Sequence, residues 1–418
     1  MWTGSAYGSR HLRSRATNIR GESPLPRTVV CVSDPISAAE GVRQRNLARV
    51  LRIVHLEGPL SRAALTEATG LNRSTIADLV TELALQGLVE ERAPDPSRRV
   101  GRPSPQVAVD PRVIAIAVNP EVDALTVAAV GLDRGIRLRE RIEHHHLPSP
   151  EDTAREVADV IGRWQAGDLA DAHIVAIGVA VPGLVRTSDG LVRNAPHLLW
   201  TDAPLRDLIA QATGVSTVVG NDASWGAVAE HLYGAGRGID DMVYLNGGAS
   251  GIGGGVIVHG MPVGGAGGYA GEFGQNRPGI PTATDRRAGD GVLEDEVSRA
   301  RLLAVAHLAS GDEPALAAAL AAAPGPDAAA EIDRQRRILS TALANAVNVL
   351  NPSVVVLGGF LATLAEHDLP GLADLVGAQA MPANMEDLDL RVASLAEDRL
   401  LIGAAEAAFA DLLRDPTA

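Results

Sequence analysis

Three arginines are concentrated in the short segment RRVGRPSP, where they are Arg98, Arg99 and Arg102. The glycine and the two prolines of this segment exclude a helix and favour an extended arm. Guanidinium groups on an extended arm bind phosphates and fit the narrow minor groove of double-stranded DNA. We therefore predict that these three arginines contact DNA.

A second group of polar residues opens a predicted helix closer to the N-terminus. Arg73, Ser74 and Thr75 occupy its first turn, where a recognition helix usually meets base edges and phosphates in the major groove. We predict that these residues also bind DNA. Asp78 on the same helix is an exception, because a carboxylate repels phosphate unless it accepts a hydrogen bond from a cytosine amino group.

The spacing of apolar residues predicts the helices that hold these groups. In two segments apolar residues recur at positions i, i+3, i+4 and i+7, which is typical of helices with one buried face: Leu47, Val50, Leu51 and Val54, and then Ile76, Leu79, Val80 and Leu83. Between them Ser61 is a suitable N-cap for a short helix that ends at Ala68, and Asn72 is a suitable N-cap for the next helix.

The wing follows these helices. Gly87 ends the third helix, and short strands at 88–89 and 107–109 enclose a loop, residues 92–106, that carries the three arginines. This order of elements predicts a winged helix-turn-helix domain at residues 42–110. The alternative is a three-helix structural module whose arginines form a solvated surface. The helices and the arginine-rich wing together favour DNA binding.

Charge is distributed unevenly along the chain. The first 112 residues contain 16 arginines and 11 acidic residues, whereas the remainder contains 21 arginines and 40 acidic residues. The first part is suited to DNA, and the net acidity belongs to the second part. Residues 1–41 combine arginine with Ser, Gly and Pro and lack an apolar signal core, so we predict a disordered basic tail, which is either native or an over-long start of the reading frame.

The cysteine content and hydropathy indicate a cytoplasmic protein. The single cysteine, Cys31, excludes an intramolecular disulfide and a cysteine-based zinc site. No apolar run approaches the roughly 20 residues needed to cross a bilayer, so no membrane partner is expected. From residue 113 onwards β-rich segments alternate with helical ones, which predicts an α/β domain. The predicted strands are 113–118, 124–130, 174–181, 217–219, 242–246, 253–258 and 354–357, and the main predicted helices are 152–164, 222–231 and 331–350.

Six motifs in the second part resemble the ROK family of repressors, open reading frames and sugar kinases. They are GVAVPGLV at 178–185, GNDASWGAVAE at 220–230, GGASGIGGGVIVHG at 247–260, GYAGEFGQ at 268–275, GVLE at 291–294 and VVVLGGFLA at 354–362. The winged helix resembles that of the family's sugar-responsive repressors, such as those for xylose and N-acetylglucosamine. The resemblance implies a two-lobed fold of the actin and hexokinase type, with a first lobe at 111–220, a C-terminal helix at 399–415 that packs back on it, and a second lobe at 221–398.

The resemblance also implies a sugar site. Asn221 and Asp222 are expected to bind ring hydroxyls, with Asp222 at the position of the general base in the kinases, and Glu272 and Glu294 are expected to accept from further hydroxyls. Gln275 stands where the family has a histidine and retains the ability to hydrogen-bond a hydroxyl. The alternative is that Asp222 only caps the following helix and that Glu272 is an exposed loop charge.

Two departures from the family pattern argue against enzyme activity and metal binding. The turn that approaches nucleotide phosphates in the kinases is replaced by residues 118–123, VNPEVD, which lack its glycines and add proline and glutamate. Three cysteine positions of the family's zinc site correspond to Asp285, Arg287 and Val292, so no thiolate remains. We expect no catalytic residue, no metal and no cofactor. The run 144–146, HHH, precedes Pro148 and is expected to be a solvated loop.

Together these observations predict a cytoplasmic, sugar-responsive transcriptional regulator that acts as a repressor. Its expected partners are double-stranded operator DNA, a sugar or sugar derivative, and a second copy of the chain in a homodimer or homotetramer, because a two-fold dimer reading a palindromic site multiplies contacts. Two alternatives stay open. One is an active sugar kinase with a DNA-binding domain, and the other is a regulator whose sensor responds to a protein partner.

Overall fold

The computed structural model describes residues 38–93, 105–280, 282–288, 291–308, 313–322 and 325–417. Most of the predicted tail, residues 1–41, lies outside this set, and so do Cys31 and the predicted DNA-binding residues Arg98, Arg99 and Arg102. The described residues from Val42 onwards belong to one compact unit.

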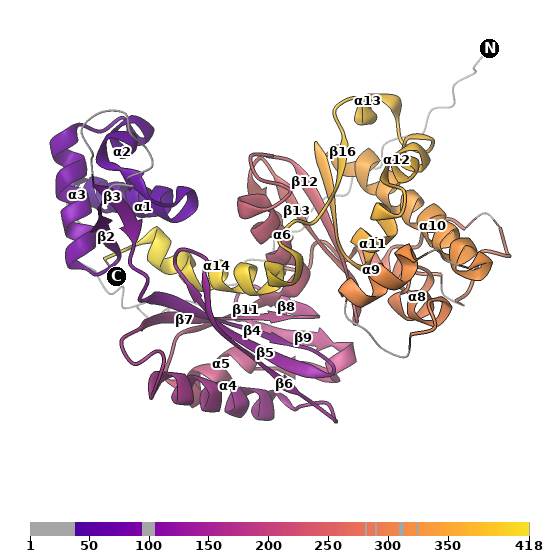
Figure 1. Cartoon of the computed structure of the whole chain (residues 1–418), viewed down its shortest axis with the longest axis horizontal. Coiled ribbons are helices and arrows are strands. Elements are labelled where there is room, and N and C mark those ends of the chain that lie inside the picture. The colour runs from indigo at the N-terminus through magenta and orange to yellow at the C-terminus, as the bar shows by residue number, and fades with distance from the viewer. Residues whose placement is uncertain are drawn as a thin grey trace, which may run out of the picture. The chain divides into compact units, whose positions relative to one another are not determined.

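The first described residues fold into three helices and a small antiparallel sheet (Figure 1). Ser61 caps the second helix by accepting a hydrogen bond from the backbone N–H of Ala64, and Asn72 caps the third by accepting from the N–H of Thr75, so both predicted caps are confirmed. The strand order β1-β3-β2 gives this region the connectivity of a winged helix-turn-helix. Its elements are α1 (Ala38–Glu57), β1 (Leu60–Ser61), α2 (Arg62–Thr69), α3 (Arg73–Leu85), β2 (Val89–Arg92) and β3 (Gln106–Val109).

The base of the wing differs slightly from the prediction. Arg92 and Gln106 are paired across β2 and β3, so both belong to the strands and not to the loop that we predicted at 92–106. The strand β2 continues through three consecutive charged residues, VEER, whose side chains are half-buried or exposed. These residues show no alternation of apolar and polar positions, which is why the sequence pattern predicts a strand that ends at residue 89.

The first lobe is built on a five-stranded sheet with the strand order β11-β7-β4-β5-β6. Strands β4, β7 and β11 are parallel to one another, and the β4–β5 and β5–β6 pairs are antiparallel. Figure 1 shows α4 and α5 on one face of this sheet and α14 on the other. The lobe consists of β4 (Val113–Pro120), β5 (Ala124–Gly131), β6 (Ile136–Glu143), α4 (Pro150–Gln165), β7 (His173–Val181), β8 (Leu184–Arg186), β9 (Leu191–Ala195), η1 (Pro196–Leu198), β10 (Trp200–Ala203), α5 (Leu205–Thr213), β11 (Thr217–Asn221) and α14 (Arg399–Arg414).

Strand β6 was not predicted, although its sequence IRLRERIE alternates apolar and charged residues. Its side chains alternate between half-buried and exposed positions along the whole strand, as expected for an edge strand with one face against the core. The separate small sheet, β10-β9-β8, was also not predicted. Its strands have three to five residues each, which is too short for a periodic signal.

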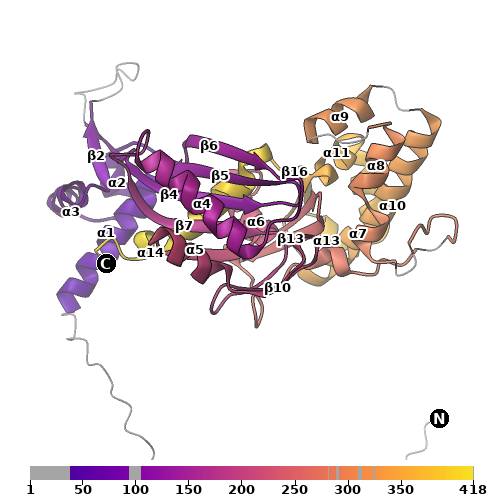
Figure 2. The same ribbon diagram turned by 90° about the horizontal axis from the view of Figure 1, so that it is seen from below.

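The second lobe contains the other five-stranded sheet, in the order β14-β13-β12-β15-β16. Figure 2 shows α8, α9, α10 and α11 gathered together at one end of this lobe. None of the helices in the described part of the chain has the length and apolar content to cross a membrane. The lobe consists of α6 (Asp222–Tyr233), β12 (Met242–Gly248), β13 (Gly251–Val258), β14 (Met261–Pro262), η2 (Phe273–Gln275), α7 (Leu293–Glu296), α8 (Arg299–Val305), α9 (Glu313–Ala321), α10 (Pro326–Leu350), β15 (Val354–Gly359), α11 (Phe360–Glu366), α12 (Leu369–Gly377), α13 (Pro382–Met385), β16 (Asp389–Val392) and η3 (Ala396–Asp398).

The winged helix and the first lobe share one buried apolar cluster. It joins the apolar stripe of α1, including Leu47 and Val54, to Phe409 and Leu413 of α14. The same cluster contains Val113 and other residues of the first sheet. Because tightly packed side chains transmit displacement, a movement of α14 must be accommodated by α1.

Candidate functional site

The junction between β11 and α6 fixes the first polar residue of the site. Asn221 caps α6, because its Oδ1 accepts a hydrogen bond from the backbone N–H of Ser224 at 2.8 Å. Its Nδ2 donates to the backbone carbonyl of Gly183 at 3.0 Å, which ties the start of α6 to the first lobe. The capping role that we considered for Asp222 therefore belongs to Asn221.

Asp222 is the first residue of α6 and has an unusual environment. Its Oδ1 accepts a hydrogen bond from the backbone N–H of Ala223 at 2.7 Å. Burial raises the pKa of Asp222 to about 7, and the carboxylates of Glu121 and Glu272 add to this increase, which the Ala223 N–H and Arg399 only partly oppose. A carboxyl group with a pKa near neutrality can accept or donate a proton at physiological pH, as functional-site acids often do.

A second acidic group comes from the two short segments η2 and α7. The Nε2 of Gln275 donates to Oε1 of Glu294 at 2.5 Å, and the backbone N–H of Ile252 donates to Oε2 of Glu294 at 3.2 Å. Gly251 has a φ of 117°, a backbone conformation that side chains rarely adopt, and a Cβ atom there would also displace Oε2 of Glu294, so glycine is favoured beside this carboxylate. Burial raises the pKa of Glu272, and the charge of Glu294 adds to the effect.

These residues line a single cleft. All five residues predicted from the family resemblance, Asn221, Asp222, Glu272, Gln275 and Glu294, contribute to a cavity of about 430 Å³. This volume lies within the range of about 300–1,000 Å³ that is usual for small-molecule sites. Carboxylates and amides converging on a cleft of this size match the needs of a polyol, each of whose buried hydroxyls requires a hydrogen-bond partner.

Sequence reasoning missed several polar residues of the same cleft. Asn194 and His197 approach it from the small sheet of the first lobe, and Asn246 and Ser250 approach it from the β12–β13 hairpin. Asn246 is itself held in place, because its Oδ1 accepts hydrogen bonds from the Tyr244 hydroxyl at 3.2 Å and from Nε of Arg399 at 3.0 Å. The motif at 247–260 predicted the position of the hairpin. No local signal indicated that Asn194 and His197 of the first lobe lie opposite this hairpin in the cleft.

The glycine-rich motif has a packing role that needs no nucleotide. A Cβ atom at Gly253 would lie 2.6 Å from the Cβ of Ala223, and one at Gly255 would lie 2.4 Å from the Cβ of Ala227. The absence of side chains at Gly253 and Gly255 therefore lets α6 pack directly on β13. This contact fixes the start of α6, and with it Asp222, against the second sheet.

The predicted DNA-binding residues of α3 are accessible. Arg73 and Ser74 are exposed and Thr75 is half-buried. The Ser74 hydroxyl donates to Oδ1 of Asn72 at 2.7 Å, so its oxygen is free to accept from a base, whereas donating to a base requires it to give up this partner. Asp78 is also exposed.

A model described as the ROK family matches residues 115–410. The chain belongs to the ROK family. Within this family it is 25% identical over 405 residues to the xylose repressor of Caldicellulosiruptor bescii, a match that covers 90% of this chain and 98% of that one. It is 26% identical to the N-acetylglucosamine repressor of Escherichia coli O6:H1, with coverage of 87% and 92%.

Kinases of the ROK family match a shorter part of the chain. The glucokinase of Thermotoga maritima is 31% identical over 275 residues, which cover 61% of this chain and 84% of the kinase. Among solved structures, a ROK family transcriptional regulator, a homologue of the E. coli MLC protein, superposes with a TM-score of 0.71 at 24% identity and covers 89% of this chain and 98% of its own. This likeness establishes the two-lobed fold.

Residues 118–123, which the resemblance aligns with the phosphate-binding turn of ROK kinases, form a tight acidic hairpin. Pro120 is paired with Leu125 across β4 and β5, and the backbone N–H of Glu121 donates to the carbonyl of Ala124 at 2.8 Å. Arg141 holds the two carboxylates of the turn, at 3.0 Å from Glu121 and 3.2 Å from Asp123. Burial raises the pKa of Glu121, although Arg141 opposes this increase. A proline and two carboxylates at this position are unsuited to bind phosphate oxygens.

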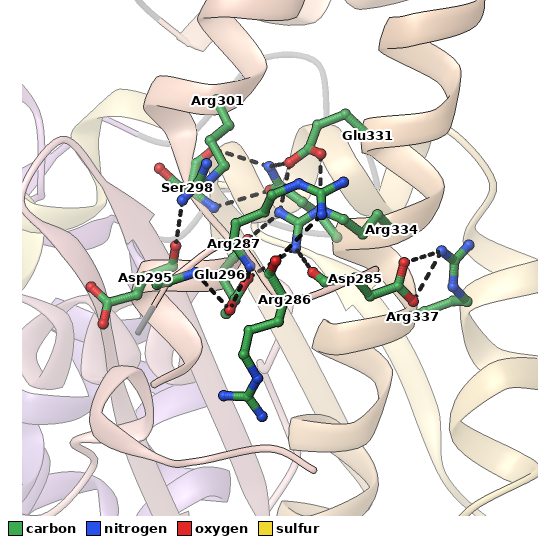
Figure 3. Close-up of polar contacts among 12 residues, drawn as sticks. Asp285, Arg286, Arg287, Asp295, Glu296, Ser298, Arg301, Glu331, Arg334 and Arg337 are labelled. Atoms are coloured by element: carbon green, nitrogen blue, oxygen red, sulfur yellow. Dashed lines mark hydrogen bonds and ion pairs between the residues drawn. The ribbon is translucent and has the colours of Figure 1, made fainter. Parts of the chain in front are cut away.

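The segment that corresponds to the zinc site contains a cluster of arginines and carboxylates (Figure 3). Two of the positions expected from the resemblance, Asp285 and Arg287, lie in this cluster. The backbone carbonyl of Asp285 accepts from Arg334 at 2.8 Å, and the backbone N–H of Arg287 donates to Glu296 at 2.9 Å. Within the described residues, no group of three or more His, Cys, Asp or Glu side chains is arranged to hold a metal ion.

We expect the purified protein to contain no stoichiometric zinc. The carboxylates of Asp285, Glu296 and Glu331 are already paired with arginines, and an arginine cannot serve as a metal ligand. Elemental analysis should find far less than one zinc per chain, and chelators should leave the melting temperature unchanged. A measured ratio of one zinc per chain would show this prediction to be wrong.

The histidine run at 144–146 differs in part from the prediction of a solvated loop. The side chain of His144 is buried and its Nε2 lies 2.9 Å from a carboxylate oxygen of Glu156 on α4. His145 and His146 are exposed, as predicted. The first histidine is buried because β6 ends beside α4, a contact between segments that local sequence does not reveal.

Proposed function

We propose that this ROK family member is a sugar-responsive transcriptional repressor that binds operator DNA through residues 42–110 and a sugar or sugar derivative in the cleft between the lobes. The observation that carries the proposal is the conjunction of a winged helix with a cleft lined by Asn221, Asp222, Glu272, Gln275 and Glu294 in one chain. The repressors named above match about nine-tenths of the chain, so the likeness includes the winged helix.

The proposal includes the organisation of the chain. We assign the sensor to a first lobe at 111–220, completed by the helix at 399–415, and a second lobe at 221–398. We further propose that the protein acts in the cytoplasm as a homodimer or homotetramer, since paired winged helices that read two half-sites bind far more tightly than one. Size-exclusion chromatography with light scattering tests the oligomeric state.

Helix α6 is the proposed route from the cleft to the DNA-binding region. Its first residue, Asp222, lines the cleft, and its last residue, Tyr233, reaches α1 and α14. The Tyr233 hydroxyl donates to Oε1 of Glu406 at 2.6 Å and lies 2.8 Å from Nε2 of His55. His55 is 1% exposed, and its Nδ1 donates to the backbone carbonyl of Leu132 at 2.5 Å. Sugar binding that moves α6 would therefore disturb a buried hydrogen-bonded contact with the winged helix.

The proposed function is tested by DNA binding with and without sugars. Genomic fragments selected by the purified protein supply the operator, and fluorescence anisotropy then measures affinity in the presence of D-xylose, D-glucose or N-acetyl-D-glucosamine. We expect one sugar class to change the operator affinity by about 5- to 150-fold, which is the usual size of allosteric coupling. Failure to select any DNA would contradict the proposal.

Replacing Arg102 with alanine tests the wing directly. We expect weaker operator binding and a salt dependence lower by about one phosphate equivalent, or a weaker preference for A·T pairs if the arginine lies in the minor groove. Arg112→Ala is the matched control, because Arg112 follows β3 and is paired with Asp110 at 2.6 Å. Equal salt slopes for wild type and Arg102→Ala would remove the wing from the DNA interface.

An active sugar kinase is the second candidate. The pKa of Asp222 near neutrality favours it, because a general base requires such a group. The acidic hairpin at Glu121 disfavours it, because phosphoryl transfer requires the nucleotide phosphates to be held in line with the sugar oxygen. ATP turnover measured across a panel of hexoses separates the two functions.

A sensor that responds to a protein partner is the third candidate, favoured by the loss of the family's histidine and cysteines. Thermal-shift measurements distinguish it from a sugar sensor. A ligand present at 100 times its dissociation constant should stabilise the protein by about 2.7 kcal/mol. Absence of any shift across the sugar panel would favour the protein partner.

A further inference from the structure

The buried arginine Arg334 on α10 is hydrogen-bonded to three segments of the second lobe (Figure 3). They are α10 itself, α7 and the loop at 282–288. Its side chain is 2% exposed. Its Nε and one terminal nitrogen donate to the two carboxylate oxygens of Glu331, at 2.8 and 2.7 Å. The other contacts are to Oε2 of Glu296 at 3.0 Å, to the backbone carbonyl of Glu296 at 2.6 Å and to the backbone carbonyl of Asp285 at 2.8 Å. Five contacts equal the five N–H donors of a guanidinium group, so every donor has a partner.

Glu296 extends this cluster to the adjoining loop, residues 282–288. Its carboxylate, which is fully buried, accepts hydrogen bonds from the backbone N–H groups of Arg287 and Ala288 at 2.9 to 3.0 Å. Burial acts to raise the pKa of Glu296, but these two N–H groups and Arg334 outweigh burial and leave the pKa below its usual range. Glu296 is therefore held as a carboxylate that joins the loop to Arg334.

The cluster is rigidly connected to the cleft. Glu294 and Glu296 belong to the same four-residue helix, α7, and Glu294 lines the cleft while Glu296 faces Arg334. Leu293, which is completely buried, begins α7, and its backbone N–H donates to the carbonyl of Asn276 at 2.8 Å. The position of the Glu294 carboxylate thus depends on where Arg334 holds the end of α7.

Stability alone does not require this arrangement. Replacing a buried ion pair by apolar residues of similar volume is often neutral or stabilising, because charges lose hydration when they are buried. A fully paired network instead permits only one geometry, since each shift leaves a buried donor or acceptor without a partner. Such a network is suited to a place where a backbone segment has to be fixed.

We propose that Arg334 is a positioning residue for the ligand cleft, whose guanidinium holds loop 282–288, α7 and α10 together and thereby fixes the carboxylate of Glu294 for ligand binding. The inference rests on the proposed sugar-binding function of the cleft. It assigns to an arginine of α10, remote in sequence from every cleft residue, an influence on ligand affinity that acts through α7.

The experiment compares Arg334→Lys with Arg336→Lys. Lysine keeps the positive charge but offers three donors on one nitrogen, so it cannot reach all three segments. Arg336 is the matched control, because it is also buried, lies on the same helix and donates to the backbone carbonyl of Asp368 at 2.6 Å instead of to the loop. The probe is whichever of D-xylose, D-glucose and N-acetyl-D-glucosamine gives the largest thermal shift with the wild-type protein.

We expect Arg334→Lys to lower the affinity for that sugar at least tenfold and to leave operator affinity without sugar unchanged, whereas Arg336→Lys changes neither. Hydrogen exchange provides a readout without ligand: the amides of Ile252 and Leu293 should exchange faster in Arg334→Lys only. Equal sugar affinities, or equal losses in both variants, together with unchanged exchange at these amides, would overturn the proposal. If no sugar binds the wild type, the proposed function fails, and the exchange data still decide the positioning role.

A second variant keeps the test valid if Arg334→Lys does not fold. The triple variant Arg334→Met, Glu296→Gln, Glu331→Gln removes all three charges and leaves no unpaired buried ion. We expect it to melt within a few degrees of wild type and to bind the sugar at least tenfold more weakly. Wild-type sugar affinity together with wild-type protection of the Ile252 and Leu293 amides in this variant would also overturn the proposal.

Discussion

Asp222→Asn is expected to lower sugar affinity about 10- to 100-fold and to remove most of the sugar response of DNA binding. A hydrogen bond to a charged group is worth about 1.5–3 kcal/mol in a buried site, which corresponds to this range. Operator affinity without sugar should not change, because Asp222 lies at the start of α6 in the cleft and not on the winged helix. Anisotropy titrations of labelled operator with increasing sugar measure the effect.

Phosphorylation supplies the contrasting readout for the same variant. We expect neither wild type nor Asp222→Asn to phosphorylate a hexose detectably, since the proline and the two carboxylates at 120–123 should not hold nucleotide phosphates, and part of the roughly 7–11 kcal/mol available from positioning the reactants should then be missing. Robust ATP-dependent phosphorylation by wild type that is abolished in Asp222→Asn would make the protein a kinase. Glu67→Gln, on the exposed surface of α2, is a control for the loss of one carboxylate.

The pH dependence of sugar binding should report the same group. With a pKa of about 7 in the folded protein, Asp222 is mostly neutral below pH 7 and mostly ionised above it. Because sugar hydroxyls donate to the ionised form, affinity should rise up to tenfold per unit as pH increases towards 7 and level off above it. The unfolded chain releases this proton near its ordinary pKa of 3.8, so between about pH 4 and 7 only the folded protein holds it. The free energy of unfolding should therefore decrease as the pH rises from about 4 to 7. Both dependences should be weaker in Asp222→Asn, and the part that remains should come from Glu121 and Glu272, whose pKa values burial also raises.

Tyr233→Phe is expected to uncouple the cleft from DNA binding while leaving both sites able to bind. The substitution keeps the ring but removes the hydroxyl that joins α6 to Glu406 and His55. We expect sugar affinity within about twofold of wild type, and the sugar-induced change in operator affinity reduced by at least fivefold. The unfolding free energy should fall by about 1–2 kcal/mol for the lost buried hydrogen bonds.

The control for Tyr233→Phe is Thr153→Val, which removes a buried hydroxyl from α4 on the opposite face of the first sheet. It should cost similar stability and leave coupling intact. His55→Ala provides a stronger disturbance, since it leaves the carboxylate of Glu406, which is 8% exposed, without its imidazole partner. We expect His55→Ala to lower the free energy of unfolding by more than Tyr233→Phe does, because it removes a buried ring together with its hydrogen bonds. Full coupling in a folded Tyr233→Phe protein would exclude α6 as the route.

Local signals were sufficient for the helices of the DNA-binding region and for most strands of the sensor. Ser61 and Asn72 cap helices because a short polar side chain can bond to backbone N–H groups two or three residues ahead, and this requirement is met entirely within the segment. The buried face of α1 could be predicted for the same reason, since helical periodicity is a local pattern. Strand β6 was not predicted, although its apolar and charged residues alternate along the sequence. Strands β8 to β10 are too short to show such an alternation.

The family motifs predicted which residues would meet in the cleft, although their separation in the sequence exceeds 70 residues between Asn221 and Glu294. The structure brings these residues to one cavity, but it also adds Asn194 and His197 from the other lobe. Their contribution depends on how the small sheet folds against the start of α6. No pattern around NAPHL encodes that contact.

The sequence by itself determined the α/β class, the winged helix and the identity of the polar groups in the cleft, because these follow from periodicity, capping and motif order along the chain. Only the tertiary structure decided the environment of those groups. The pKa of Asp222 depends on burial between two lobes, the carboxylate of Glu294 is held through Glu296 and Arg334, and His55 meets Glu406 across 351 positions of the chain. Such contacts arise from the packing of distant segments, and their energies depend on burial and distance, which have no local signature.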